Sequence, residues 1–297
     1  MRQSKPPGRA NVNNTGAEFC FLNPPMSQLV KDFYNANAAI EWQRLDVPLS
    51  QIEFVGALRL IDKYFPKHGR VFDIGGGPGR YAIELIRRGY AVTLLDISDE
   101  EIRLAQRRMS DLNLPAEQCM VGDARDLSTG ASESFDAALL LGPMYHITER
   151  EDRLVALREL ARILRPGGVA IVAYLNSWGL IKTGIVDFPN QFRDISTLRS
   201  MLGERTFTGQ SLSGFTECYW STPDVAFSEI KEAGLNIVSY AGAESFANGM
   251  GTLLEKLAEE NPEAYDNLVT VAAETCELPQ FRDSTDHLHI VVSKAHS

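Results

Sequence analysis

A glycine-rich turn near residue 75 is the feature that most constrains how this chain folds. Residues 71–80 read VFDIGGGPGR, and they lie between a short apolar run and an amphipathic segment. Glycines let a backbone turn sharply and approach a ligand without a Cβ in the way. A helix that follows such a turn offers unpaired N–H groups and the positive end of its dipole. We therefore expect a strand, a tight turn and a helix here, with a small polar ligand held at the turn.

The chain on either side of this turn favours an α/β fold. From residue 70 onward, short apolar runs alternate with amphipathic stretches, which is typical of βαβ units around a parallel sheet. Capping boxes, Ser98 with Glu101 and Thr148 with Glu151, predict the starts of two helices. We expect one further helix over about 250–276. The expected strands cover residues 71–74, 91–96, 119–121, 135–141, 169–174, 236–240 and 287–292.

Composition narrows the classes of partner. Of the 297 residues 44% are hydrophobic, which is enough for a full core, and the net charge is −10 because 39 acidic residues outnumber 29 basic ones. Nucleic-acid binding needs basic charge, so DNA or RNA is not the expected main partner. The sequence has neither a membrane-spanning run nor the apolar core of a signal peptide near its start, and we expect a soluble, cytoplasmic protein.

The sequence contains no strong pattern of metal-ligating residues. The four cysteines form no CxxC pair. His287 and His289 would share one face of a strand, as metal ligands can, but no third ligand is evident. We interpret them as a surface pair and expect no metal.

The glycine spacing separates two kinds of cofactor. A dinucleotide site needs G-x-G-x-x-G, and counting from Gly75 the last glycine position holds Arg80. The pattern is instead D-x-G-x-G-x-G. This spacing argues against a nicotinamide-dependent oxidoreductase, which stays as the less favoured alternative.

The D-x-G-x-G-x-G pattern resembles the first motif of class I S-adenosylmethionine-dependent methyltransferases. In that family an acidic residue ends the second strand and binds the ribose hydroxyls, which here implies Asp96, with Ile97 packing on the adenine. An acidic residue after the third strand commonly binds the adenine amino group, which implies Asp123 in the sequence Gly-Asp-Ala. The turn LRPGG at residues 164–168 also resembles the family's L-x-P-G-G ahead of the fifth strand.

The resemblance extends to two flanking segments. Residues 140–146, LLGPMYH, match the segment that lines the methionine and acceptor side, and they place Leu141 beside the cofactor and Tyr145 with His146 beside the acceptor. Tyr34 and residues 41–45, EWQRL, resemble the N-terminal helix of the small-molecule members, which closes over the cofactor. We expect Arg44 to pair with the cofactor's methionine carboxylate.

The resemblance and the glycine turn together give a set of expected site residues. His146 has two interpretations, first a structural or cofactor-lining histidine and second a general base, and it is the candidate catalytic residue. We expect aromatic residues after the fifth strand, Trp178, Tyr219 and Trp220, to supply much of the acceptor pocket. The expected cofactor-binding residues are Asp73, Gly75, Gly76, Gly77, Gly79, Asp96, Ile97, Asp123, Ala124, Leu141, Tyr34 and Arg44.

The expected fold is a Rossmann-like, doubly wound, seven-stranded α/β sheet whose last strand is antiparallel, as the resemblance implies. The expected division is a flexible tail at 1–26, an N-terminal helical cap at 27–68, a cofactor-binding core at 69–178, a lid insertion at 179–221 and the rest of the same domain at 222–297. The expected function is methyl transfer from S-adenosylmethionine to an O, N or S nucleophile of a small-molecule acceptor. A regulatory or non-methylating member of the fold is the alternative from another class.

Overall fold

The computed structural model describes residues 26–207 and 216–296. All but the last residue of the tail expected at 1–26 lies outside this description, as do residues 208–215 of the expected lid. No helix within the two described ranges is long and apolar enough to cross a membrane.

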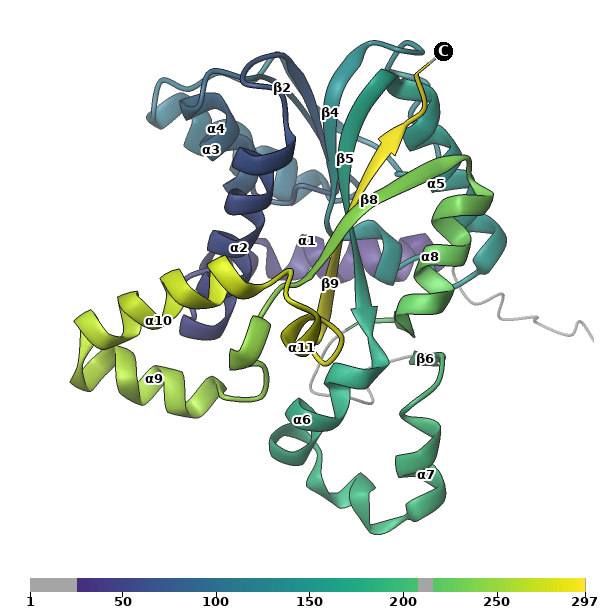
Figure 1. The fold of residues 1–297 in the computed structure, drawn as a ribbon. Helices are drawn as coiled ribbons and strands as arrows, with labels where there is room; N and C mark the ends of the chain where they lie inside the picture. The colour runs from purple at the N-terminus through teal and green to yellow at the C-terminus, as the bar shows by residue number, and fades with distance from the viewer. Residues whose placement is uncertain (1–25, 208–215, 297) are drawn as a thin grey trace, which may run out of the picture.

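A twisted sheet forms the centre of the molecule (Figure 1). Its seven main strands follow one another in space in the order β3-β2-β1-β4-β5-β9-β8. The last strand of the chain, β9, is antiparallel to both of its neighbours, so the expected fold is confirmed. These strands are β1 (Arg70–Ile74), β2 (Ala91–Asp96), β3 (Gln118–Val121), β4 (Phe135–Leu140), β5 (Leu164–Asn176), β8 (Leu235–Gly242) and β9 (His287–Lys294).

Two short strands extend the sheet beyond the seven expected ones. β7 (Cys218–Ser221) pairs with the last two residues of β5, and β6 (Arg205–Phe207) pairs with β7. Neither is long enough to give a recognisable alternation of apolar and polar residues, and β7 joins the sheet through a strand that lies far away along the chain.

Helices cover both faces of the sheet, each over its own apolar cluster. The cluster on one face gathers residues from α2 (Pro48–Tyr64), α3 (Arg80–Arg87) and α4 (Asp99–Asp111). The cluster on the other face gathers residues from α5 (Arg150–Ile163) and α8 (Pro223–Glu232). A sheet buried on both sides explains why its strands read as continuous apolar runs.

The two predicted capping boxes have different outcomes. The Ser98 side chain accepts a hydrogen bond from the Glu101 N–H at 3.1 Å, so the first is confirmed. The second is wrong, because α5 begins at Arg150 with Glu149 as its N-cap residue and no capping side chain. The Thr148 carbonyl instead accepts a hydrogen bond from the guanidinium of Arg153, which holds Thr148 ahead of the helix.

The single helix expected over about 250–276 is two helices, α9 (Gly251–Glu260) and α10 (Pro262–Thr275). Pro262 has no N–H to donate to the preceding turn, and the Asn261 side chain caps the new helix by accepting the Ala264 N–H at 3.3 Å. Both helices pack on α2 through a small apolar cluster that includes Ile52 and Leu254. Two short elements flank them, η3 (Ser245–Ala247) and α11 (Pro279–Arg282).

The N-terminal helix α1 (Met26–Arg44) packs against α4, far from its own place in the sequence. The side-chain oxygen of Asn35 accepts hydrogen bonds from the Ser98 hydroxyl and the Glu100 N–H, at 2.7 and 3.2 Å. Lys31 adds an ion pair with Asp99 at 2.6 Å. These contacts fix α1 beside the turn that follows β2.

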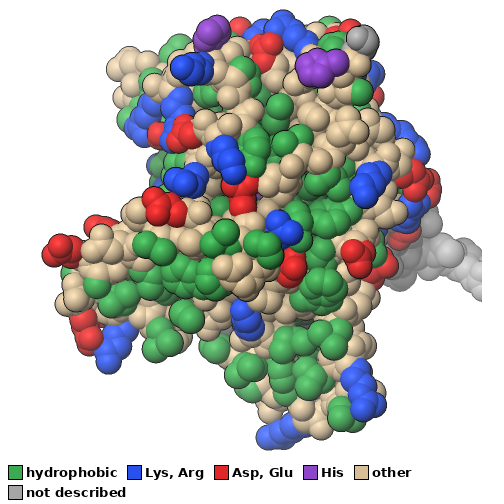
Figure 2. All heavy atoms as spheres, in the orientation of Figure 1, with side chains coloured by type: hydrophobic (Ala, Val, Ile, Leu, Met, Phe, Trp, Pro, Cys, Tyr) green, Lys and Arg blue, Asp and Glu red, His purple; other side chains and the backbone are tan. Residues whose placement is uncertain are grey.

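A small lobe projects from the end of β5 (Figure 1). It contains α6 (Ser177–Asp187), η2 (Pro189–Arg193) and α7 (Ile195–Ser200). Figure 2 shows apolar side chains gathered on this lobe and along the helices α9 and α10. The exposed apolar residues there include Ile185, Val186 and Leu253.

A buried ion pair joins α5 to α8. The guanidinium of Arg153 donates to both carboxylate oxygens of Glu229, at 2.7 and 3.0 Å, and both side chains are almost fully buried. Tyr174 on β5 donates to the same carboxylate at 3.0 Å, and the ring of Tyr219 lies on the guanidinium at 3.6 Å. Removing one partner of such a pair leaves the other charge buried without compensation.

We therefore expect Arg153→Met to lower the free energy of unfolding by about 3–5 kcal/mol. The matched control is Arg158→Met on the same helix, whose guanidinium is exposed and lies 3.9 Å from Glu232, and it should change stability by less than about 0.5 kcal/mol. Guanidinium-chloride unfolding measures both. Equal midpoints for the two variants would contradict this role of the buried pair.

Candidate cofactor-binding and active site

One cavity of about 160 Å³ lies where the carboxyl ends of β1, β2, β3 and β4 meet the two N-terminal helices. In a doubly wound sheet this edge is where ligands bind. The cavity brings together most of the residues expected from the sequence. Its lining includes Tyr34, Arg44, Asp73, Gly75, Gly76, Gly77, Asp96, Ile97, Asp123, Ala124, Leu141, Tyr145 and His146.

Asp96 connects the two turns that form the floor of the cavity. One of its carboxylate oxygens accepts the Gly77 N–H at 2.9 Å, and the other accepts the Ser98 N–H at 2.8 Å. Each carboxylate oxygen keeps a further lone pair that can accept a ligand hydroxyl. Burial raises the pKa of the Asp96 carboxyl to about 6, against the lowering effect of these two N–H groups.

Two further acids lie behind the glycine turn. Burial, reinforced by the charge of Asp96, raises the pKa of Asp73 to about 7 and that of Glu101 to about 9. Neither oxygen of Glu101 has a hydrogen-bond partner among the described residues. Such a concentration of acids disfavours binding of the phosphates of a dinucleotide and is compatible with a ligand that carries positive charge.

The glycines of the turn have different roles. A Cβ on Gly75 would lie 2.4 Å from Pro143, and one on Gly76 would lie 2.4 Å from the Asp73 carboxylate, so both are needed for close packing around the cavity. Gly77 has a φ of +52° and no close neighbour, which leaves its face of the turn open to a ligand. Gly79, expected at the cofactor, is absent from the cavity lining and packs against Ala105 and Met109 of α4, with a φ of +83°.

Asp123 lines the cavity, but a neighbouring arginine already binds its carboxylate. The guanidinium of Arg125 donates to both oxygens of Asp123, at 2.6 and 3.0 Å, and to Asp152 at 2.6 Å. Despite its partial burial, Asp123 has a lowered pKa because of these hydrogen bonds. Its contact with the adenine amino group stays a prediction.

Tyr34 and His146 meet at the cavity, although 112 positions separate them in the sequence. The Tyr34 hydroxyl lies 2.7 Å from His146 Nε2, and His146 Nδ1 lies 2.9 Å from the Glu217 carbonyl. Since a carbonyl only accepts, Nδ1 carries the proton, and Tyr34 donates to Nε2. Burial lowers the pKa of His146 to about 4 and raises that of Tyr34 well above its usual value, so both groups are neutral near pH 7.

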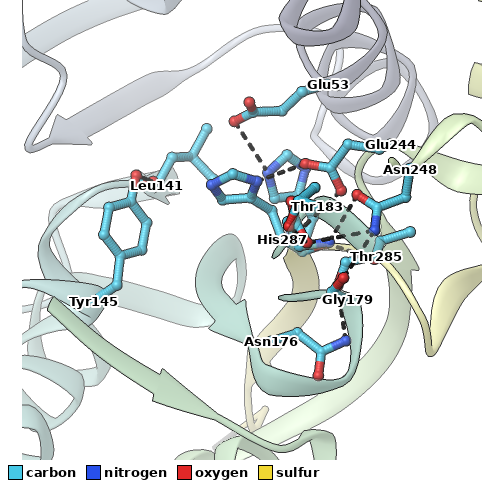
Figure 3. Close-up of polar contacts among 12 residues, drawn as sticks. Glu53, Leu141, Tyr145, Asn176, Gly179, Thr183, Glu244, Asn248, Thr285 and His287 are labelled. Carbon is cyan, nitrogen blue, oxygen red and sulfur yellow. Dashed lines mark hydrogen bonds and ion pairs between the residues drawn. The ribbon is translucent and has the colours of Figure 1, made fainter. Parts of the chain in front are cut away.

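The neighbouring residues complete this end of the cavity. Tyr145, in the short helix η1 (Pro143–Tyr145), donates its hydroxyl to the Leu141 carbonyl at 2.8 Å (Figure 3). Arg44 pairs with Glu41 at 2.6 Å and with Glu53 at 3.4 Å. Arg44 therefore lines the cavity as expected, but carboxylates of the chain itself already balance its charge.

The aromatic residues expected in the acceptor pocket lie elsewhere among the described residues. Trp178, Tyr219 and Trp220 are absent from the lining of the cavity. The Trp178 indole donates to the Leu202 carbonyl, and Tyr219 lies on Arg153 and donates to Glu204. Trp220 packs beside Tyr145 in a separate apolar cluster. Their role in acceptor binding stays a prediction, which these contacts do not support.

Several cavity residues were missing from the sequence-based set. Glu53 on α2 and Arg80 at the start of α3 both line the cavity. The Arg80 guanidinium lies 4.7 Å from the centre of the Trp42 ring and 2.9 Å from Asp46, so it connects the glycine turn to α1. The position of Arg80 in the motif was visible in the sequence, but its partners were not.

Comparison with known proteins agrees with this geometry. Residues 71–168 match the family described as "Methyltransferase domain". The chain is similar to the tRNA 5-carboxymethoxyuridine methyltransferase of Escherichia coli K12, with 25% identity over 264 residues, which cover 87% of this chain and 88% of that protein.

Two solved structures share the fold. An S-adenosylmethionine-dependent methyltransferase from Clostridium acetobutylicum has a TM-score of 0.56 at 15% identity, covering 88% of this chain and 99% of that one. The 1,6-didemethyltoxoflavin-N1-methyltransferase of Burkholderia thailandensis, solved with S-adenosylhomocysteine, has a TM-score of 0.54 at 14% identity, covering 91% and 88%.

The matched segment contains the glycine turn, Asp96, Asp123 and His146, all of which line the one cavity described above. The open face of Gly77 and the carboxylate of Asp96 lie side by side in this cavity, and their contact with the ribose of the cofactor stays a prediction. The chain is a class I S-adenosylmethionine-dependent methyltransferase.

Proposed function

We propose that this enzyme methylates an O, N or S nucleophile of a small-molecule metabolite, and that its acceptor binds in the cavity beneath α1. The observation that carries the proposal is the charge around the cavity. Acids outnumber arginines in its lining, which contains Glu41, Glu53, Asp73, Asp96, Asp123, Glu149 and Asp152 with Arg44, Arg80 and Arg125.

The three arginines of the lining are each bound to a carboxylate of the chain. Arg44 pairs with Glu41 and Glu53, Arg80 with Asp46, and Arg125 with Asp123 and Asp152. A nucleic acid needs cationic groups that can replace the counterions of its phosphates. These guanidinium groups would first have to leave their carboxylates.

A tRNA acceptor is the second candidate, because the Escherichia coli relative aligned over most of both chains is named as a tRNA methyltransferase. The net charge of −10 and the acidic lining favour the small molecule over the tRNA. The two candidates differ in acceptor only, and they share the cofactor.

The bound cofactor supplies an activated methyl group on a sulfonium, so the chain mainly has to align the acceptor and exclude water. Asp96 would accept the ribose hydroxyls while it keeps its bonds to Gly77 and Ser98. α1 covers the cavity, and Tyr34 is the residue of this helix that contacts His146.

The contacts of His146 support the proposal that it receives a proton from the acceptor. Its Nδ1–H is fixed on the Glu217 carbonyl, which directs the lone pair of Nε2 at the Tyr34 hydroxyl. An acceptor that displaces this hydroxyl would present its own proton to Nε2. Because its pKa is lowered to about 4, His146 is a weak base, suited to an acceptor whose proton is already acidic.

An activity assay tests the acceptor class. The full chain is incubated with S-adenosylmethionine and either pooled small metabolites or unmodified tRNA, and the S-adenosylhomocysteine that forms is measured. We expect turnover with a metabolite pool and none with tRNA; the reverse would overturn the proposal.

His146→Ala should slow turnover by about 10²-fold or more, whereas the exposed His68→Ala should not. A His146→Ala rate within threefold of the parent would end the general-base role.

We expect Asp96→Ala to weaken S-adenosylhomocysteine binding by about tenfold to a hundredfold, since a hydrogen bond to a charged group contributes about 1.5–3 kcal/mol. The ionised carboxylate is the better acceptor, so affinity in the parent should fall as the pH drops through about 6, and Asp96→Asn should lose this dependence. Asp111→Asn, exposed at the far end of α4, is the matched control. Calorimetry at pH 5.5 and 7.5, with melting curves for each variant, makes the measurement. An unchanged affinity in a folded Asp96→Ala protein would remove the ribose assignment.

A further inference from the structure

A compact group of acids and histidines lies beside the cavity, outside the set expected from the sequence. Glu53 on α2, Glu244 after β8 and His287 at the start of β9 each offer one ligand atom, and these atoms lie within 4.8 Å of one another. Glu53 and Glu244 are buried, and His287 is partly exposed. Figure 3 shows the three side chains converging from separate elements.

A second histidine, His289, points into this group. It is 1% exposed, and neither ring nitrogen has a hydrogen-bond partner among the described residues. Its Nε2 lies 3.9 Å from Glu53 Oε1, which is too long for a hydrogen bond. A buried imidazole without a partner is costly, and here it faces a carboxylate across a gap.

The existing contacts leave Oε1 of Glu53 available, and each oxygen of Glu244 keeps a further lone pair. Arg44 approaches Glu53 through Oε2 at 3.4 Å, so Oε1 is the oxygen that faces His289. Glu244 Oε1 lies 2.6 Å from His287 Nδ1, and Glu244 Oε2 accepts the His287 backbone N–H at 3.2 Å. The neighbouring Asp286 carboxylate, held by Asn248 and Thr183, adds acidic charge close by.

The charge of the group favours a cation. The buried carboxylates of Glu53 and Glu244 lie beside two imidazoles, and their negative charge would stabilise a divalent ion.

We propose that Glu53, Glu244, His287 and His289 form a binding site for a divalent transition-metal ion of the Zn²⁺ type. Two imidazoles with carboxylates select such ions over Mg²⁺ or Ca²⁺, which prefer oxygen ligands alone. Tetrahedral Zn²⁺ holds its ligands at about 2.0–2.2 Å, which sets them about 3.3 Å apart. The ligand atoms of Glu53, Glu244 and His287 lie within 4.8 Å of one another, so a bound ion would draw them together by up to about 1.5 Å.

The site adjoins the acceptor end of the cavity. Glu53 lines the cavity directly, and the His287 ring lies 6.0 Å from that of Tyr145, which also lines it. This step rests on the proposed function: an ion here would bind an oxygen or nitrogen of the acceptor and lower its pKa. An acceptor acidified in this way matches the weak base at His146.

Calorimetric titration of the EDTA-treated, dialysed full chain with ZnCl₂ tests the metal site. We expect one ion per chain, and at least tenfold weaker binding in Glu244→Gln and in His289→Asn. His68→Ala, which removes an exposed histidine far along the chain, is the control and should bind Zn²⁺ like the parent. Co²⁺ in place of Zn²⁺ should give visible absorption bands of a nitrogen- and oxygen-ligated ion in the parent and lose them in His289→Asn.

Absence of Zn²⁺ binding to the parent would overturn the proposal, whatever the folding of the variants. Binding that the Glu244 and His289 variants retain, or that His68→Ala removes, would overturn it too, and the four residues would then be structural acid–histidine pairs. Binding of S-adenosylhomocysteine is measured in the same samples. If it persists without Zn²⁺ binding, the metal site fails while the proposed function stands.

Discussion

Two backbone N–H groups from different turns point at one buried carboxylate, and the shape of the cofactor site depends on this contact. Gly77 follows β1 and Ser98 follows β2, and Asp96 accepts from both. Because neighbouring parallel strands end at the same edge of the sheet, the two turns are adjacent, and the Asp96 side chain at the end of β2 bonds to both of them. Burial raises the pKa of this carboxyl, and the two N–H groups, which take the place of water around it, oppose that rise.

The N-terminal helix completes the site from the opposite direction. Asn35 binds the turn that Asp96 organises, and Tyr34, one residue earlier, reaches His146. Arg80, at the end of the glycine turn, lies on Trp42 of the same helix. The glycine turn, the N-terminal helix and His146 are therefore parts of one connected structure. Changes in α1 should act on the chemistry as well as on binding.

The sequence predicted the local parts of this structure well, for a physical reason. Glycine spacing, the acid that ends β2 and the period of apolar residues are set by neighbours a few positions apart. Contacts between distant elements could not be predicted, because nothing in the sequence pairs Glu53 with His289, or Arg153 with Glu229. The interpretation of His287 and His289 as a surface pair is wrong for His289, which is 1% exposed, because the acids beside the two histidines come from α2 and from the segment after β8. Pro262 was visible in the sequence as a helix breaker, and the prediction of one helix did not take it into account.

The central claim is that the adenosyl group lies on the glycine turn with its ribose on Asp96, and that the reacting end lies beneath α1 beside Tyr34 and His146. A crystal structure of the full chain with S-adenosylhomocysteine tests this most directly. The account predicts both ribose hydroxyls within hydrogen-bond distance of the Asp96 carboxylate and the sulfur on the side of the cavity that His146 lines. A ligand whose ribose makes no contact with Asp96, or whose sulfur faces away from α1, would contradict it.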